Sequence, residues 1–199
     1  MTLLSFEQLA VQLQQGEPAL FPTDTLPALA AIPAAAGRIW QLKQRPADKP
    51  LILMGDSPQA LIQALGQAPP PGWQRLAALG WPGALTLVLP AQGSVVAALN
   101  PEGGGSLGLR VPASAAARQL LQRSGPLATS SANRSGQPAC LSAAEAARAF
   151  PQVARLAPVP WPAGSGLAST VVAWQPTGWQ VLRQGAVQLP PEWLVERQA

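Results

Sequence analysis

Short apolar runs alternate with longer amphipathic segments along the whole chain. Runs bounded by Gly, Pro or polar residues predict buried strands, and segments between a capping signal and a terminating Gly or Pro predict helices. Strands and helices that alternate in this way are typical of an α/β domain. We expect strands at 19–22, within 29–32, and at 51–54, 85–89, 107–111, 127–129, 170–174 and 180–183, with helices at 34–44, 73–79 and 112–123.

Helix-start signals predict three further helices. Ser5 with Gln8, and Ser142 with Glu145, have the spacing of a capping box, in which each side chain bonds the other residue's backbone N–H. Ser57 is followed by Pro at what is then the first helical position, which is also a favoured start. The last two strands are close enough together to form a terminal hairpin.

Length and composition fit one domain that covers residues 1–199. Apolar residues make up 48% of the 199 residues, which is enough for a sizeable core. No apolar stretch approaches the roughly 20 residues that a spanning helix needs, and the N-terminus has no basic region before an apolar one. Cys140 is the only cysteine. We therefore expect a cytoplasmic protein with neither membrane segment nor disulfide.

The chain has no histidine and no tyrosine, which restricts its chemistry. Ser-His-Asp triads, Cys-His dyads and ordinary zinc sites are excluded. The net charge is +4, and residues 103–191 carry seven arginines against the single acid Glu145. Such an excess is typical of a site for nucleotide phosphates or RNA, although genome composition alone also explains it. The charge by itself favours the compositional explanation.

Three cations fall within seven residues at the end of the predicted helix 34–44. Lys43 and Arg45 are too close in sequence to share a helix face, so we expect the chain to leave the helix there, before Pro46. Lys49 follows, and Asp48 is the only nearby acid. Cations are favoured at any helix C-terminus. An unpaired cluster of this kind is also suited to grip phosphates and carboxylates.

Hydroxyl-rich segments follow two predicted strands. Thr23 and Thr25 flank Asp24 after the first strand, and residues 129–138 hold four hydroxyls, two amides and an arginine. Such a loop can cradle phosphate, although no Walker A motif is present. Arg110 lies inside an apolar strand, where it needs either a structural carboxylate or an anionic ligand. The sequence leaves these two alternatives open.

Taken in order, these motifs resemble the YrdC-like family of threonylcarbamoyl-AMP synthases, in its short, single-domain form. The family pattern runs through nearly the whole chain, and seven motifs in one order are specific. They are Pro-Thr-Asp-Thr at 22–25, Lys-x-Arg-Pro at 43–46, Trp-Pro-Gly-x-Leu-Thr at 81–86, Arg-Val-Pro at 110–112, Thr-Ser-Ser-Ala-Asn-x-Ser-Gly at 129–136, Ser-Thr-Val-Val at 169–172 and Arg-x-Gly at 183–185.

The resemblance implies a twisted, mostly mixed β-sheet with flanking helices and a concave basic cavity. It implies the synthesis of threonylcarbamoyl-adenylate from L-threonine, bicarbonate and ATP, for modification of a tRNA adenosine beside the anticodon. Mg²⁺ would arrive with ATP, without a dedicated protein site. The implied partners are the tRNA-modifying threonylcarbamoyl transferase complex and, by direct binding, tRNA or other double-stranded RNA. The implied residues are Lys43 and Arg45 for catalysis, Lys43, Arg45, Ser131, Asn133, Ser169 and Arg183 for ATP, and Thr23, Thr25, Lys49, Arg110 and Thr129 for threonine.

The chain departs from the family pattern at two places that bear on function. Pro27 and Ala28 replace a Tyr-Gly pair, and Ala173 replaces an aspartate that often follows Ser-Thr-Val-Val. Two alternatives therefore stay open beside the synthase: an RNA-binding module without synthase activity, and a divergent paralogue. The intact Lys43 and Arg45 favour the synthase.

Overall fold

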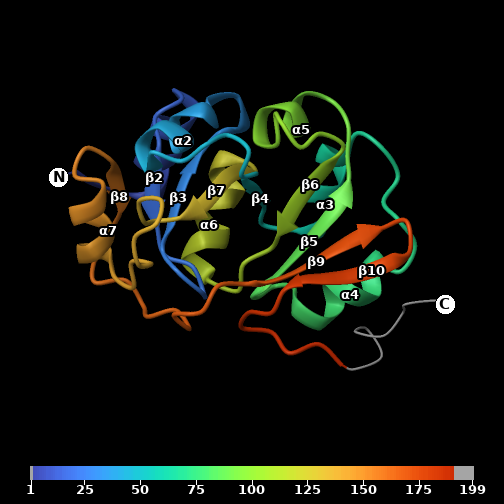
Figure 1. Ribbon diagram of the computed structural model, residues 1–199. Helices are drawn as coiled ribbons and strands as arrows, with labels where there is room; N and C mark the ends of the chain where they lie inside the picture. The colour runs from blue at the N-terminus through green and yellow to red at the C-terminus, as the bar shows by residue number, and fades with distance from the viewer. Residues whose placement is uncertain (1, 191–199) are drawn as a thin grey trace.

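A ten-stranded mixed sheet organises the computed structural model, which describes residues 2–190 (Figure 1). Its order is β1-β8-β2-β3-β7-β4-β6-β5-β9-β10, with β8 near one end of the ribbon and β10 at the other. Four neighbouring pairs are parallel (β1/β8, β2/β8, β4/β6 and β5/β9), and the rest are antiparallel. The strands are β1 (Leu3–Leu4), β2 (Ala19–Phe21), β3 (Ala28–Ala31), β4 (Ile52–Met54), β5 (Leu85–Pro90), β6 (Ser106–Arg110), β7 (Leu127–Ser131), β8 (Ala154–Leu156), β9 (Thr170–Gln175) and β10 (Gly178–Arg183).

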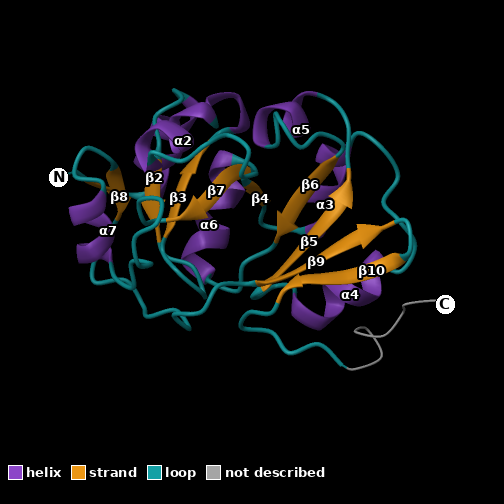
Figure 2. Cartoon of the chain, in the orientation of Figure 1, coloured by secondary structure: helices purple, strands orange, loops and turns teal. Residues whose placement is uncertain are grey.

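Helices flank this sheet on both faces (Figure 2). They are α1 (Phe6–Gln14), α2 (Gly37–Lys43), α3 (Pro58–Ile62), α4 (Trp73–Gly80), α5 (Ser94–Leu99), α6 (Ala115–Ser124) and α7 (Ala143–Ala149), with 3-10 turns at Pro33–Ala35 and Gln63–Leu65. The predicted α/β class and mixed sheet are confirmed. Every expected strand and helix is present, whereas β1, β8 and α5 were not predicted.

Capping residues determine where several helices begin, and strand pairing determines where β7 ends. Ser5 forms the full predicted capping box with Gln8. The helix predicted from 112 begins at Ala115, because the Ser114 side chain accepts the hydrogen bond from the Ala117 N–H. Strand β7 runs on to Ser131 through residues predicted as a loop, because β3 pairs with it along that whole length.

One face of the sheet, here called the first face, is covered over β8, β2 and β3 and at Leu127 of β7 and Met54 of β4. Helices α1 and α6 pack there, and their buried leucines meet Phe21 of β2 and Leu127 of β7. The second face carries the larger core, which includes Ile39 of α2, Leu76 of α4 and Leu99 of α5. The core cluster on the first face reaches Met54 of β4 but includes no residue of β6, β5 or β9, so α1 and α6 leave the first face of those three strands uncovered.

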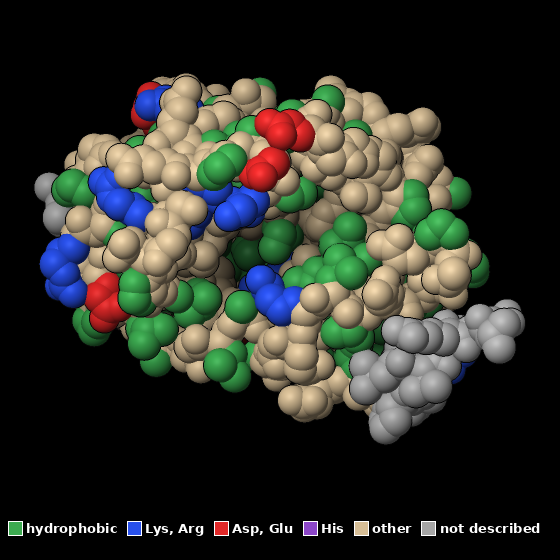
Figure 3. All heavy atoms as spheres, in the orientation of Figure 1, with side chains coloured by type: hydrophobic (Ala, Val, Ile, Leu, Met, Phe, Trp, Pro, Cys, Tyr) green, Lys and Arg blue, Asp and Glu red, His purple; other side chains and the backbone are tan. Residues whose placement is uncertain are grey.

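The alternation along β5 and β6 follows from this unequal cover. Leu85, Leu87 and Leu89 belong to the buried core on the second face, as do Leu107 and Leu109. The residues between them turn to the uncovered first face, since side chains alternate along a strand. That face is hollowed in the space-filling view, and Lys and Arg side chains stand around the hollow (Figure 3).

Within residues 2–190, no helix is long and apolar enough to cross a membrane. The end of the domain predicted at 1–199, residues 191–199, lies outside the described residues.

Candidate active site

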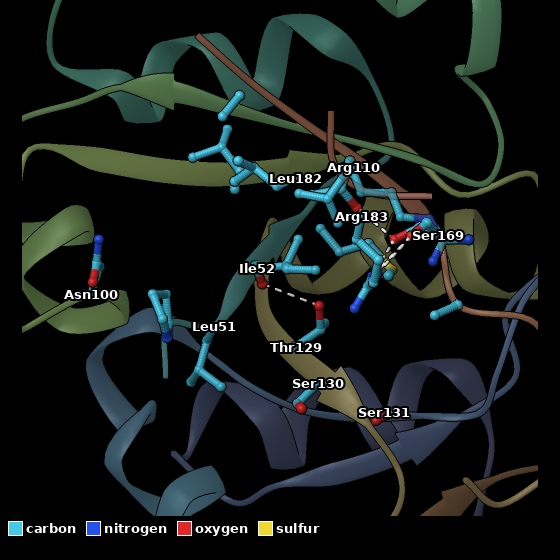
Figure 4. Close-up of a pocket in the computed structure, with 18 of the residues that line it drawn as sticks. Leu51, Ile52, Asn100, Arg110, Thr129, Ser130, Ser131, Ser169, Leu182 and Arg183 are labelled. Atoms are coloured by element: carbon cyan, nitrogen blue, oxygen red, sulfur yellow. Dashed lines mark hydrogen bonds between the residues drawn. The ribbon is translucent and has the colours of Figure 1, made fainter. Parts of the chain in front are cut away.

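The uncovered face of the sheet forms a cavity of about 580 Å³. Its floor comes from β4, β6, β5 and β9, and its sides come from β7, β10 and the segment after β2. In Figure 4, Arg110, Arg183 and Ser169 lie together on one side, Thr129, Ser130 and Ser131 follow β7 on the other, and Leu51 and Asn100 lie at the far end. Of the described residues that line it, the charged ones are Arg45, Arg110 and Arg183.

Strand register explains which side chains form the floor. Thr129 of β7 pairs with Ile52 of β4, Ile52 with Gly108 of β6, Gly108 with Val88 of β5, and Val88 with Ala173 of β9. Paired residues point to the same face, so these five form one row across the sheet. All five line the cavity. The row is polar at Thr129 and apolar elsewhere.

Arg110 is almost fully buried and joins three segments. Its Nη2 lies 2.9 Å from Oδ1 of Asp24, its Nη1 donates to Oγ1 of Thr25 at 2.8 Å, and its Nε donates to the Gly83 carbonyl at 2.9 Å. The contact of Nη2 with Asp24 is an ion pair, and Nη2 itself is buried. Of the two alternatives left open by the sequence, a structural carboxylate is therefore present.

The hydroxyls of Thr23 and Thr25 have a defined direction. Thr23 Oγ1 donates to the Leu26 carbonyl at 2.7 Å and accepts from the Thr25 N–H at 3.1 Å. The two hydroxyl oxygens are 3.0 Å apart, so Thr25 must donate to Thr23. Since Arg110 donates to Thr25, one lone pair of Thr25 Oγ1 stays available. This hydroxyl is placed to accept a hydrogen bond from a ligand N–H or O–H.

A second hydroxyl pair supports Arg183. Thr86 Oγ1 and Ser169 Oγ lie 2.8 Å apart across β5 and the start of β9, and both side chains are buried. The Ser169 carbonyl accepts from Nε of Arg183 at 3.2 Å and from its Nη2 at 2.9 Å. Both contacts hold one edge of the guanidinium.

Lys43 and Arg45 diverge because the backbone turns between them. The intervening Gln44 ends α2 in the left-handed conformation, with φ of 51° and ψ of 48°, and it is the only non-glycine residue with positive φ among residues 2–190. That conformation is uncommon for a residue with a Cβ. Arg45 turns to the cavity, where Nη1 donates to Ser130 Oγ and Nη2 to the Pro50 carbonyl, each at 3.3 Å.

Lys43 turns inward and is only 2% exposed. Its Nζ donates to the carbonyls of Ser131 and Asn133 and, at 3.4 Å, to the Asn133 side-chain oxygen. Burial, and secondly the nearby charge of Arg45, lowers the pKa of Lys43 to about 8. Neither Lys43 nor Arg45 forms an ion pair among the described residues, but both donate hydrogen bonds to neutral oxygen atoms of the protein.

Asn133 is likewise satisfied within the chain. Its Oδ1 accepts from Ser131 Oγ at 2.6 Å, and its Nδ2 donates to the carbonyls of Arg134 and Gln137. Together with Lys43, it fixes the segment that follows β7.

The structure brings most of the predicted site residues to one cavity. Thr23, Thr25, Arg45, Arg110, Thr129, Ser131, Ser169 and Arg183 line it, whereas Lys43, Lys49 and Asn133 are not among the lining residues. Thr129 donates to the Ile52 carbonyl at 3.1 Å, and Lys49 is exposed. Burial lowers the pKa of Arg45, Arg110 and Arg183, with Asp48 and Asp24 opposing the shift at the first two. Three partly dehydrated cations at one cavity favour an anionic ligand.

The sequence motifs did not predict the apolar floor of the cavity, nor two polar side chains beside it. Thr86 and Ser130 contact predicted site residues, and Ile52, Gly108 and Val88 form the floor. The signal was available in the alternation of β5 and β6, where residues between buried leucines must face the opposite side.

No group of three potential metal-ligating side chains occurs in the described part of the chain. The described lining residues offer hydroxyl and carbonyl oxygens and three cations, without a carboxylate. This donor set suits a divalent ion that phosphate oxygens and water hold.

Fold and cavity together define an α/β protein with an arginine-lined cavity on the open face of a mixed sheet. The Sua5/YciO/YrdC family model, described as "Telomere recombination", matches residues 11–185. The chain therefore belongs to this family.

Relatives with assigned names agree with that membership. A threonylcarbamoyl-AMP synthase of Neisseria gonorrhoeae is 35% identical over 147 residues, which are 72% of this chain and 77% of the relative. A threonylcarbamoyl-AMP synthase of Bacillus subtilis is 34% identical over 172 residues, or 83% of this chain and 49% of that one. The structure of Pyrococcus abyssi Sua5 complexed with L-threonine is 32% identical, with a TM-score of 0.83 over 90% of this chain and 54% of that chain. This chain thus spans about half the length of the last two.

Proposed function

We propose that this chain is a threonylcarbamoyl-AMP synthase. The threonine amine and bicarbonate give a carbamate and water, and a carbamate oxygen then attacks the α-phosphate of ATP. The bond between the α- and β-phosphates breaks, so pyrophosphate leaves and threonylcarbamoyl-adenylate remains. One observation carries the proposal: three partly dehydrated arginines and a row of oriented hydroxyls share one cavity, in a chain whose relatives are named for this reaction.

The threonine end of the cavity is assigned to the side where Arg110 and Thr25 meet. Arg110 supplies a positive charge for the threonine carboxylate, and Thr25 keeps an acceptor for the amine or hydroxyl. Thr23 orients Thr25, and Thr129 lies on the neighbouring floor. Lys49 is outside the lining residues, so its assignment to threonine requires that its exposed side chain reach the cavity mouth.

The triphosphate is assigned to Arg45, Arg183, Ser131 and Ser169, which all line the cavity. Lys43 contacts the segment that carries Ser131, and Asn133 holds the same segment. A divalent ion, which we take to be Mg²⁺, would be held by phosphate oxygens and water, and it would partly neutralise the phosphates.

Catalysis on this assignment is positioning together with charge stabilisation. The nucleophile belongs to the substrate, so the chain does not have to supply one. Carbamate and triphosphate repel each other, and Arg45, Arg110 and Arg183 offset that repulsion. The arginines are preorganised, because hydrogen bonds to Ser130, Gly83 and Ser169 hold each guanidinium before the ligands arrive.

Further proposals follow from the synthase assignment. We propose that residues 1–199 form one domain and that a transferase complex moves the product's threonylcarbamoyl group to a tRNA adenosine. An RNA-binding module is less well supported, because the arginines line a cavity with hydroxyls rather than an aromatic platform. The departures Pro27, Ala28 and Ala173 all line the cavity, so activity itself must separate a synthase from a divergent paralogue.

The test is pyrophosphate release from ATP and bicarbonate with threonine or valine as the amino acid. We expect release with threonine and a rate at least tenfold lower with valine, because a site that hydrogen-bonds a hydroxyl rejects analogues without it. The adenylate should appear by mass spectrometry with threonine. Failure to form it would overturn the synthase assignment, and equal rates with both amino acids would overturn a hydroxyl-reading pocket.

A further inference from the structure

Gly108 lies at the centre of the cavity floor. Strand β6 runs between β4 and β5, and Gly108 pairs with Ile52 on one side and Val88 on the other. Arg110 lies two residues further along the same strand and Ser106 two residues before, and all of these residues line the cavity. The middle of the floor therefore has no side chain of its own.

The chain itself does not require glycine at this position. Its φ lies outside the left-handed region, so an L side chain fits the backbone. An added Cβ would lie 3.6 Å from Ile52 Cγ1 and Thr86 Cγ2 and 3.9 Å from Val88 Cγ2, which are ordinary contacts. Glycine inside a strand is unfavourable, because it packs nothing and loses more backbone freedom on folding.

Two other glycines near the site differ in this respect. A Cβ at Gly164 would collide with the Thr25 backbone, and one at Gly185 would collide with the backbone of Ala168 and Ser169. Packing within the protein explains those two. At Gly108 the space above the strand belongs to the cavity, and a glycine of this kind marks a close approach by another molecule.

We propose that Gly108 is a specificity-determining residue that lets the planar base of the nucleotide lie directly against the sheet. This inference rests on the proposed function, because it takes ATP as the ligand. Ile52 and Val88 flank Gly108, and Ala173 follows Val88 in the same row, so the floor here is flat and apolar. A flat apolar surface suits the face of a base, whereas the phosphates go to the arginines at the side of the cavity.

The test compares ATP with inorganic pyrophosphate, which has phosphates but no base. Calorimetric titrations are made with wild type, Gly108→Ala and Gly108→Val. Because overfilling a fitted space is costly, we expect the Kd for ATP to rise about threefold in the alanine variant and about tenfold or more in the valine variant. The Kd for pyrophosphate should stay within about twofold of wild type.

Gly37→Ala is the matched control. Gly37 lies at the start of α2, outside the cavity lining, and a Cβ there meets nothing within 4 Å. It should leave both affinities unchanged. The melting temperature of Gly108→Ala should equal or exceed that of wild type, since alanine restricts the unfolded chain.

Two outcomes would overturn the inference: unchanged ATP affinity in the folded alanine and valine variants, or an equal loss of ATP and pyrophosphate binding. If the valine variant fails to fold, the alanine variant decides alone. Wild-type pyrophosphate release with threonine is measured in parallel. Its absence would count against the synthase assignment, whereas altered ATP binding in the variants tests Gly108 separately.

Discussion

The ion pair of Arg110 with Asp24 offers the sharpest test of the site's energetics. Both side chains are largely buried, at 6% and 18% exposure, and Arg110 Nη2 lies 2.9 Å from Asp24 Oδ1. At an effective dielectric constant of about 20, unit charges at this separation attract by about 6 kcal/mol, an attraction that the lost hydration partly offsets. Asp24→Ala leaves a buried guanidinium with no opposing carboxylate.

We expect Asp24→Ala to lower the free energy of unfolding by about 3–5 kcal/mol. For a chain of this length, the melting temperature should fall by roughly 6–20 °C. Urea titration followed by tryptophan fluorescence measures the change. Saturating threonine should recover part of the loss, because its carboxylate supplies the missing negative charge and ligand binding stabilises the folded state.

Glu17→Ala is the control, because it removes the carboxylate of an ion pair that is exposed rather than buried. The Arg38–Glu17 pair is shorter, at 2.6 Å, but its side chains are 45% and 48% exposed. Exposed pairs contribute about 0–1 kcal/mol, so this variant should stay within 1 kcal/mol of wild type. If Asp24→Ala cost no more than Glu17→Ala, the argument that burial makes the Arg110 pair important to stability would be refuted.

Three further predictions concern polar contacts around the cavity. The folded-state pKa of Lys43, lowered to about 8, lies below that of an unfolded lysine, so the unfolded chain binds more protons between these values and stability should rise with pH above about 8. Urea unfolding at pH 7.5 and 9.5 should show a smaller rise in Lys43→Met, and an equal rise would count against the shift. Thr86→Val keeps the shape of the side chain but removes the hydroxyl partner of Ser169. Threonine-dependent pyrophosphate release should fall about tenfold, which is typical of a hydrogen bond lost in a buried site. An unchanged rate would contradict a positioning role for Thr86. Asn133→Ala should cost about 1–3 kcal/mol in stability and more than Ser131→Ala, because it removes both the acceptor of the Ser131 hydroxyl and the donor to the Gln137 carbonyl. The reverse order in urea titrations would contradict this explanation.

Much of the fold was readable from local sequence. The capping box at Ser5, the buried strands and the terminal hairpin each depend on residues next to one another, so local patterns predicted them. The end of α2 between Lys43 and Arg45 was also predictable, since neighbouring residues cannot share a helix face. Strands β1 and β8 were not, because their pairing depends on segments distant in the sequence.

The sequence by itself determined which polar groups are available to the site, and the order of its motifs indicated the family. Only the tertiary structure decided what each group contacts. Register across the sheet placed Gly108 between Ile52 and Val88, and the left-handed turn at Gln44 sent Lys43 inward and Arg45 to the cavity. These outcomes depend on strand pairing and backbone direction over the whole fold, because a side chain's partners come from segments far apart in the sequence, which no local pattern specifies.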